Sequence, residues 1–77
     1  MNIEEIRNRL WNIANYWYEA KAALRIPRGF VDYVISGELR RAGENYWIVS
    51  YPHGSVGFYE DAVTNITENV ITIREDE

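Results

Sequence analysis

The chain has 77 residues, no cysteine and a formal net charge of −4, with eight Lys and Arg against twelve Asp and Glu. That length suits one domain, and the lack of cysteine excludes disulfides and thiolate metal sites. The core therefore depends on three Trp, six Tyr and two Phe, which bury much area at modest entropic cost. We expect a single small α+β domain over residues 1–77, with a frayed acidic tail at residues 73–77.

Residues 3–24 have the apolar spacing of one helix face. Apolar residues recur there at alternating intervals of three and four: Ile3, Ile6, Leu10, Ile13, Trp17, Ala20 and Leu24. Asn2 is suited to be the N-cap, and Pro27 is placed to stop the helix. We expect a long helix with Leu10 and Trp17 at the centre of the core.

Residues 30–42 fit two patterns. In a strand, Val31, Tyr33 and Ile35 would face one side, whereas in a helix Gly43 would supply the C-cap. We favour the strand, because β-branched and aromatic residues crowd the segment and Gly37 interrupts it. Residues 41–45 then form a hairpin connection to residues 46–51, YWIVSY, which predict a second strand.

The last third of the chain predicts a strand, a short helix and a final strand. Residues 55–59 suit a short strand before the hydrophobic period changes. A helical face is then formed by Tyr59, Ala62, Val63 and Ile66, with Glu60 and Asp61 in its first turn. Residues 70–73 are the final strand. The expected order is α-β-β-β-α-β, with the long N-terminal helix packed on a mostly antiparallel four-stranded sheet.

The sequence contains no arrangement of residues that is typical of catalysis or of cofactor binding. His53 is the single histidine and could act as a general acid or base, but no catalytic cysteine or GxSxG turn accompanies it. One histidine without cysteine excludes the ordinary zinc patterns, and no glycine-rich phosphate loop is present. We therefore expect no enzymatic activity, no cofactor, no metal and no small-molecule ligand.

The start of the chain gives an expectation for location. Its first residues, MNIEEIRN, are polar and acidic rather than a secretory segment. No apolar run in the sequence has the length of a membrane span. We expect a cytoplasmic protein without membrane association.

Charge divides the chain into unequal halves. Residues 1–41 carry seven cations and five acids, a net +2, whereas residues 42–77 carry one cation and seven acids, a net −6. The acidic half would repel nucleic acid and attract basic partners. A winged-helix nucleic-acid-binding domain stays an alternative if residues 30–42 are helical, because Arg25, Arg28, Arg40 and Arg41 could then converge.

Protein binding is the function that these observations favour. Trp11 and Tyr18 lie seven residues apart and beside the apolar stripe of the predicted helix, and such aromatics dominate binding hot spots. Alternatively, a broad helix face is covered by the sheet and both are core residues. We expect a non-catalytic inhibitor or adaptor that contacts a protein partner, or a second copy of itself, through Trp11, Tyr18, Glu60 and Asp61. A further alternative is a small-ligand pocket lined by Trp17, Tyr33 and Trp47.

Overall fold

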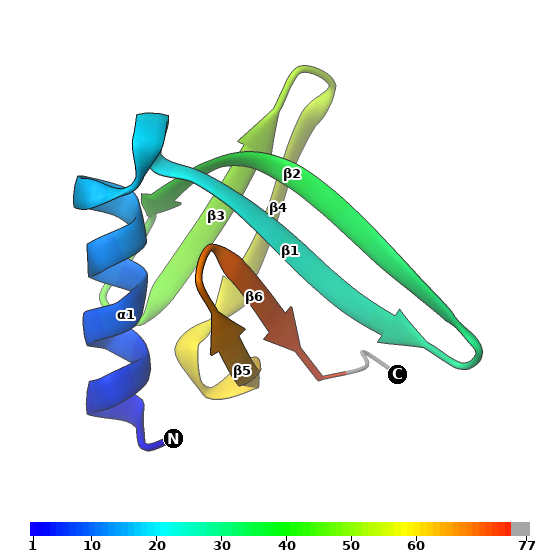
Figure 1. Ribbon diagram of the computed structural model, residues 1–77, viewed down its shortest axis with the longest axis horizontal. Coiled ribbons are helices and arrows are strands. Elements are labelled where there is room, and N and C mark those ends of the chain that lie inside the picture. The colour runs from blue at the N-terminus through cyan, green and yellow to red at the C-terminus, as the bar shows by residue number, and fades with distance from the viewer. Residues whose placement is uncertain (75–77) are drawn as a thin grey trace.

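The computed structural model describes residues 1–74, which form an α+β fold with one α-helix and a mixed six-stranded sheet (Figure 1). In chain order the elements are α1 (Ile3–Tyr16), the 3₁₀ turn η1 (Tyr18–Ala20), β1 (Lys21–Arg28), β2 (Val31–Arg41), β3 (Tyr46–Tyr51), β4 (Gly54–Tyr59), the 3₁₀ turn η2 (Glu60–Ala62), β5 (Val63–Thr67) and β6 (Val70–Ile73). The predicted α+β class is confirmed. Residues 75–77 of the predicted acidic tail lie outside the described residues.

The sheet has six strands rather than the four that the sequence predicts. Its spatial order is β4-β3-β2-β1-β6-β5. Neighbouring strands are antiparallel except β1 and β6, which are parallel. The two extra strands are β1 and β5. The first half of β1, up to Leu24, and most of β5 were predicted to be helical.

The first helix ends at Tyr16, so its predicted extension to residue 24 is wrong. It begins as expected, because the Asn2 side chain accepts a hydrogen bond of 2.8 Å from the Glu5 N–H. Trp17 then adopts an extended backbone, and alternate residues of β1 are buried from Ala22 onwards. The apolar residues of this stretch suit both a helical and a two-residue period. The strand forms because β1 is hydrogen-bonded to β2 on one side and to β6 on the other.

The short helix predicted from Tyr59 is also wrong, since only η2 is helical and β5 follows it. Val63 and Ile66 are both buried although they lie three residues apart. The pairing of β5 with β6 shifts register between Val63 and Asn65. This irregularity adds one residue to the strand, so two residues three apart face the same side. A β-bulge therefore reproduces the spacing that indicates a helix.

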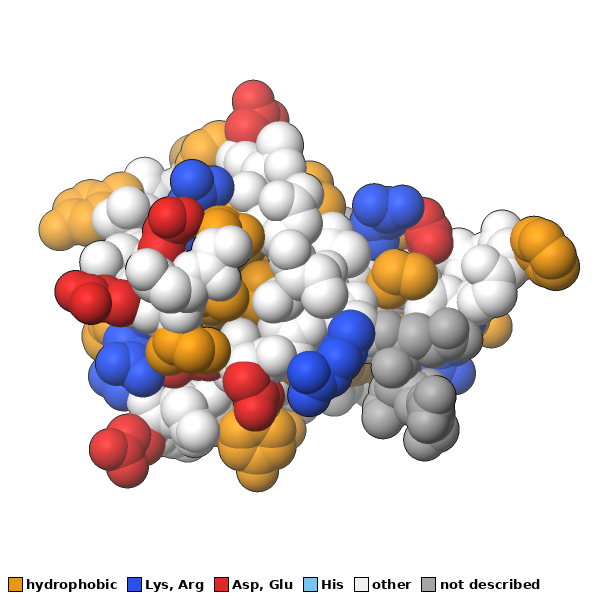
Figure 2. Space-filling model, turned by 90° about the horizontal axis from the view of Figure 1, so that it is seen from below, with side chains coloured by type: hydrophobic (Ala, Val, Ile, Leu, Met, Phe, Trp, Pro, Cys, Tyr) orange, Lys and Arg blue, Asp and Glu red, His pale blue; other side chains and the backbone are white. Residues whose placement is uncertain are grey.

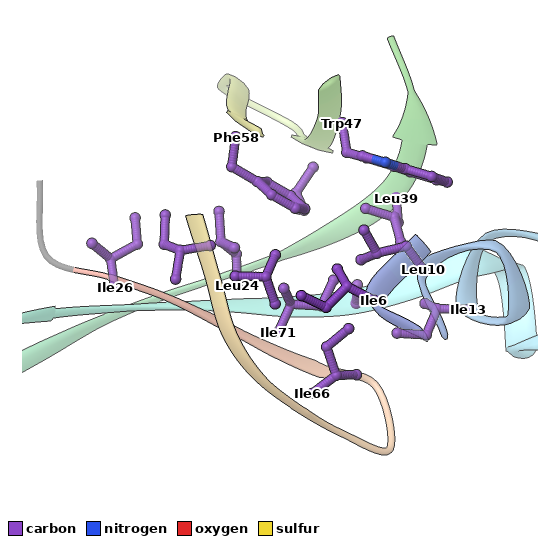
Figure 3. Close-up of a cluster of buried hydrophobic side chains, with 14 residues drawn as sticks. Ile6, Leu10, Ile13, Leu24, Ile26, Leu39, Trp47, Phe58, Ile66 and Ile71 are labelled. Carbon is purple, nitrogen blue, oxygen red and sulfur yellow. The ribbon is translucent and has the colours of Figure 1, made fainter. Parts of the chain in front are cut away.

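The core lies between α1 and the inner face of the sheet (Figure 3). Leu10 is fully buried, as predicted, and packs with Ile6 and Ile13 of the same helix. Trp17 is 41% exposed, so its predicted place at the centre of the core is wrong. The buried hydrophobic residues of the strands are Ala22, Leu24, Ile26, Leu39, Trp47, Val49, Phe58, Val63, Ile66, Ile71 and Ile73.

The short connection η2 requires the sheet to curl. It links β4 to β5, which are the opposite edge strands of the sheet. Four Cα–Cα steps separate Tyr59 from Val63 and span at most about 15 Å, whereas the edges of a flat six-stranded sheet lie about 24 Å apart. Phe58 of β4 and Ile66 of β5 accordingly belong to one buried cluster. The helix α1 contacts β1, β2, β5 and η2, and so covers the inner side of the curl.

We predict that Leu10→Ala lowers the free energy of unfolding by about 2–5 kcal/mol, because it leaves a cavity between α1 and the sheet. This is a large part of the ~5 kcal/mol total expected for a small domain. The matched control is Ile3→Ala on the same helix, since Ile3 is 41% exposed and should cost less than about 1 kcal/mol. Chemical denaturation measures both. Equal losses for the two variants would contradict the assigned core face.

Candidate functional site

Three consecutive aromatic residues lie exposed where α1 ends. We call Tyr16, Trp17 and Tyr18 the aromatic turn; they are 84%, 41% and 74% exposed. Tyr18 also contacts the ammonium group of Lys21, which lies 5.6 Å from the centre of its ring. Large aromatic side chains are rarely left in water without a use, and Trp and Tyr are the commonest hot-spot residues of interfaces. The aromatic turn is therefore the strongest candidate for a binding surface.

The backbone after the aromatic turn is held in an uncommon conformation. Glu19 and Ala20 have φ angles of 52° and 54°, in the left-handed region that non-glycine residues seldom adopt. Such a residue costs about 1–2 kcal/mol. The Ala20 N–H donates to the Trp17 carbonyl at 2.9 Å, and the Lys21 N–H donates to the Tyr18 carbonyl. These bonds fix the direction in which the aromatic side chains leave the backbone.

An open groove with a volume of about 970 Å³ lies next to the aromatic turn. The end of α1 and η1 form one wall, with Trp17 at its edge, and the end of β3 forms the other, with Tyr51. Small residues of β1 and β2, Ala22, Ala23 and Gly37, line the space between. The groove is open because these side chains leave the space between the two aromatic walls unfilled.

Gly37 is necessary for the shape of this groove. A Cβ atom at this position would collide with the carbonyl oxygen of Ser50 in β3. Only glycine therefore lets β3 approach β2 so closely here. The pairing of β2 with β3 ends at the next residue, where Glu38 faces Ser50. Beyond this point the two strands separate, and β2 continues with β1 as its only paired strand in the described part of the chain (Figure 1).

Trp11 and Tyr18 do not share one helix face as the sequence predicts, because α1 ends at Tyr16 and Tyr18 lies in η1. Trp11 is 38% exposed. Its ring contacts the buried Trp47 ring edge to face, with centroids 5.6 Å apart. The Arg41 guanidinium lies 5.5 Å from the centre of the Trp11 ring. Much of the Trp11 surface is thus used inside the domain, whereas Tyr18 stays available to a partner.

Glu60 and Asp61, the two acidic residues predicted to contact a partner, differ in position. Asp61 is exposed. Glu60 is only 1% exposed, and its carboxylate accepts hydrogen bonds from three donor groups. These are Nε of Arg7 at 3.1 Å, Nη2 of Arg7 at 2.8 Å and Nε1 of Trp47 at 2.9 Å. The carboxylate of Glu60 therefore binds within the domain, joining α1, β3 and η2.

The environment of Glu60 determines its ionisation. Burial raises the pKa of the carboxyl group, while the hydrogen bonds from Arg7 and Trp47 and the charges of Arg7 and Arg41 lower it. The lowering effects prevail, so the pKa lies below its ordinary value of 4.5. The hydrogen bond and the charge of Glu60 raise the pKa of Arg7 in turn. Both groups are charged at neutral pH, and the pair contributes to stability as an ion pair.

Tyr16 and Trp17 were not predicted to be surface residues, although the sequence contains a signal for their exposure. Three consecutive side chains on a helix point in directions about 100° apart, so one face cannot bury Tyr16, Trp17 and Tyr18 together. Such a run of aromatics indicates that at least one is exposed. The groove had no comparable signal, because its walls come from segments far apart in the sequence.

The comparisons with known proteins identify no family for this chain. No family model, no curated protein and no solved structure matches it. Over residues 1–74, no helix has the length and apolar character needed to cross a membrane. The part of the chain that the structure describes also has no group of three or more His, Asp or Glu side chains arranged to hold a metal ion.

The buried carboxylate predicts a pH dependence of stability. Because the pKa of Glu60 is lower in the folded than in the unfolded chain, its contribution is present at pH values above about 4.5 and disappears as the pH falls through the folded pKa. Glu60→Gln should lower the free energy of unfolding by about 1–3 kcal/mol at pH 7, and this difference should shrink in acid. Denaturant titrations from pH 7 to pH 3 measure it. Glu68→Gln, at an exposed position, is the control, and a Glu60→Gln effect that is constant with pH would contradict the ion pair.

Proposed function

We propose that this chain is a non-catalytic protein-binding module, an inhibitor or adaptor that contacts a larger partner through the aromatic turn and the neighbouring groove. The observation that carries the proposal is the exposure of Tyr16, Trp17 and Tyr18 together at one place on the surface. Two tyrosines and a tryptophan supply a large contact area with few rotatable bonds. The proposal assigns no catalytic role to any residue.

The local backbone supports this proposal. Binding costs less when the contacting residues are already ordered, because less conformational entropy is lost on association. The hydrogen bonds of η1 order the aromatic turn, and the Ala23 N–H donates to the Asn69 carbonyl at 2.9 Å, joining the first residues of β1 to the β5–β6 turn. The left-handed residues Glu19 and Ala20 are an unfavourable arrangement of the kind that persists mainly at functional positions.

The shape and charge of the surface indicate what kind of partner fits. A protruding partner side chain or loop would enter the groove between Trp17 and Tyr51, while Tyr16 and Tyr18 would contact its surroundings. The domain carries a net charge of −4, which favours a partner with a basic surface. Proteins that handle nucleic acid commonly have such surfaces, so an acidic inhibitor of one of them is a form of this proposal.

The two alternatives from the sequence differ in support. The winged-helix hypothesis requires a helix at residues 30–42, and that segment is the strand β2. The small-ligand hypothesis named Trp17, Tyr33 and Trp47, but Trp47 is fully buried and only Trp17 of the three lines the groove. The groove itself has a volume typical of small-molecule sites, about 300–1,000 Å³. A small ligand in the groove is therefore the second candidate function.

We predict that Tyr16→Ser combined with Tyr18→Ser lowers the affinity for a protein partner by at least 30-fold, the equivalent of about 2 kcal/mol at an interface hot spot. The partner is first identified by quantitative mass spectrometry of proteins captured on the wild-type domain. Its affinity for each variant is then measured by calorimetry. Thermal unfolding should change by only a few degrees, because both side chains are exposed.

The matched control is Tyr59→Ser, at the end of β4, where the side chain is 55% exposed and belongs to neither the aromatic turn nor the groove. This control should bind the partner within about threefold of the wild type. A partner that is lost with the Tyr59→Ser control and retained with the double tyrosine variant would contradict the proposed site. Absence of any captured protein, together with saturable binding of a small molecule in the groove by NMR, would favour the second candidate.

A further inference from the structure

One side of β2 has no neighbouring strand over half of its length. β2 runs from Val31 to Arg41, but β3 pairs only with its last part, from Glu38 to Arg41. We call residues 31–36 of β2 the open edge. In an antiparallel strand, alternate residues direct their N–H and C=O groups away from the paired neighbour. Within the described part of the chain, no backbone hydrogen bond outside the β1–β2 ladder involves the open edge.

The open edge lacks the features that normally prevent strands from pairing with other chains. Such edges usually carry lysine, proline, a bulge or an unpaired charge. Residues 31–36 read VDYVIS and contain neither lysine nor proline. The single charge, on Asp32, is already paired with Arg25 of β1, with 2.6 Å between Nη2 and Oδ2. By contrast, the two edge strands of the sheet have irregular features that hinder such pairing. β5 contains a register shift, and β4 contains two glycines.

Apolar side chains surround the open edge. Val31, Tyr33 and Val34 are 61%, 55% and 60% exposed, and Phe30 beside them is fully exposed at the end of the hairpin. In Figure 2 hydrophobic side chains extend to the end of the molecule that the β1–β2 hairpin forms. A long apolar strand edge of this kind is a surface for pairing with another strand.

We propose that the open edge pairs with the open edge of a second copy of this chain, in an antiparallel dimer whose two-fold axis passes beside Val34. In this register Val34 of one copy faces Val34 of the other, Tyr33 faces Ile35, and Asp32 faces Ser36. The first two are aromatic and β-branched pairs, which stabilise sheets. The third places a hydroxyl donor opposite a carboxylate. The interface is isologous, so it closes at two copies.

The side-chain pairs favour this register. Shifting the axis by one residue to Ile35 would leave only residues 34–36 of the open edge to pair, because β3 already occupies the edge from Glu38 onwards. Shifting it to Tyr33 would place the Asp32 carboxylate opposite Val34, which offers it no hydrogen-bond donor. Parallel pairing in register would place Asp32 beside Asp32. In the proposed register no like charges face each other along the open edge, so a second copy fits despite the net charge of −4. Five paired residues extend over about 17 Å, which suits a reversible dimer with micromolar affinity rather than a permanent one.

The dimer is tested by sedimentation velocity over a range of concentrations. For the wild type we expect the average mass to rise from 9.1 kDa to twice that value. Val34→Lys places two ammonium groups at the axis and should weaken the dimer at least tenfold. Because Val34 is exposed, its monomer should fold normally, which thermal unfolding verifies. Asn12→Lys, at an exposed position of α1, is the control and should dimerise like the wild type.

A second variant tests the register without weakening the interface. The chain has no cysteine, so Val34→Cys introduces a single thiol at the proposed axis, where facing residues are close enough for a disulfide. Oxidation should yield a covalent dimer at least ten times faster than in Asn12→Cys. A wild type that stays monomeric at millimolar concentration would overturn the proposal, and so would dimers that Val34→Lys leaves unchanged or species larger than two copies. Pairing of the open edge only with an extended peptide from another protein would overturn self-association as well.

Discussion

The ion pair between Glu60 and Arg7 lies where the fold is most constrained. Three residues of η2 connect the two edge strands of the sheet, so this end of the sheet must curl to close. The carboxylate of Glu60 is 1% exposed and is bound by Arg7 of α1 and Trp47 of β3. An unpaired carboxylate at this depth would be strongly unfavourable. The pair therefore fixes the position of α1 against the curl, and thereby the place at which the aromatic turn emerges.

Local features of the sequence predicted the segments whose structure depends on near neighbours. The aromatic and β-branched composition of YWIVSY predicted β3 (Tyr46–Tyr51), and the side chain of Asn2 predicted the start of α1. The strand from Lys21 to Arg28 was missed because its apolar residues suit two periods. Pairing with β6 decides that this segment is a strand rather than a helix. β6 lies almost fifty residues later in the chain, so no local pattern reveals the pairing. Glu60 was interpreted as a helix N-terminal charge for the same reason, since Arg7 lies 53 residues away.

The candidate surfaces also differ in whether they depend on near neighbours in the sequence or on distant segments. The exposure of at least one aromatic residue among Tyr16, Trp17 and Tyr18 follows from their adjacency. The groove instead is lined by η1, the middle of β2 and the end of β3, which are distant in the sequence. The aromatic turn and the open edge of β2 share no residue. One chain could therefore bind a partner at the first surface and a second copy at the other, and linking two sites in this way strengthens binding to a partner that presents two equivalent surfaces.

A double-mutant cycle between Arg7 and Glu60 tests most directly whether their interaction stabilises the fold. Arg7→Met, Glu60→Gln and the double variant are compared with the wild type by denaturant unfolding at pH 7. Arg7 retains 40% of its side-chain exposure, which weakens the pair relative to a fully buried one. We predict a coupling free energy of at least about 1 kcal/mol, with the double variant less destabilised than the sum of the single changes. Additive effects within about 0.3–0.5 kcal/mol would contradict the account.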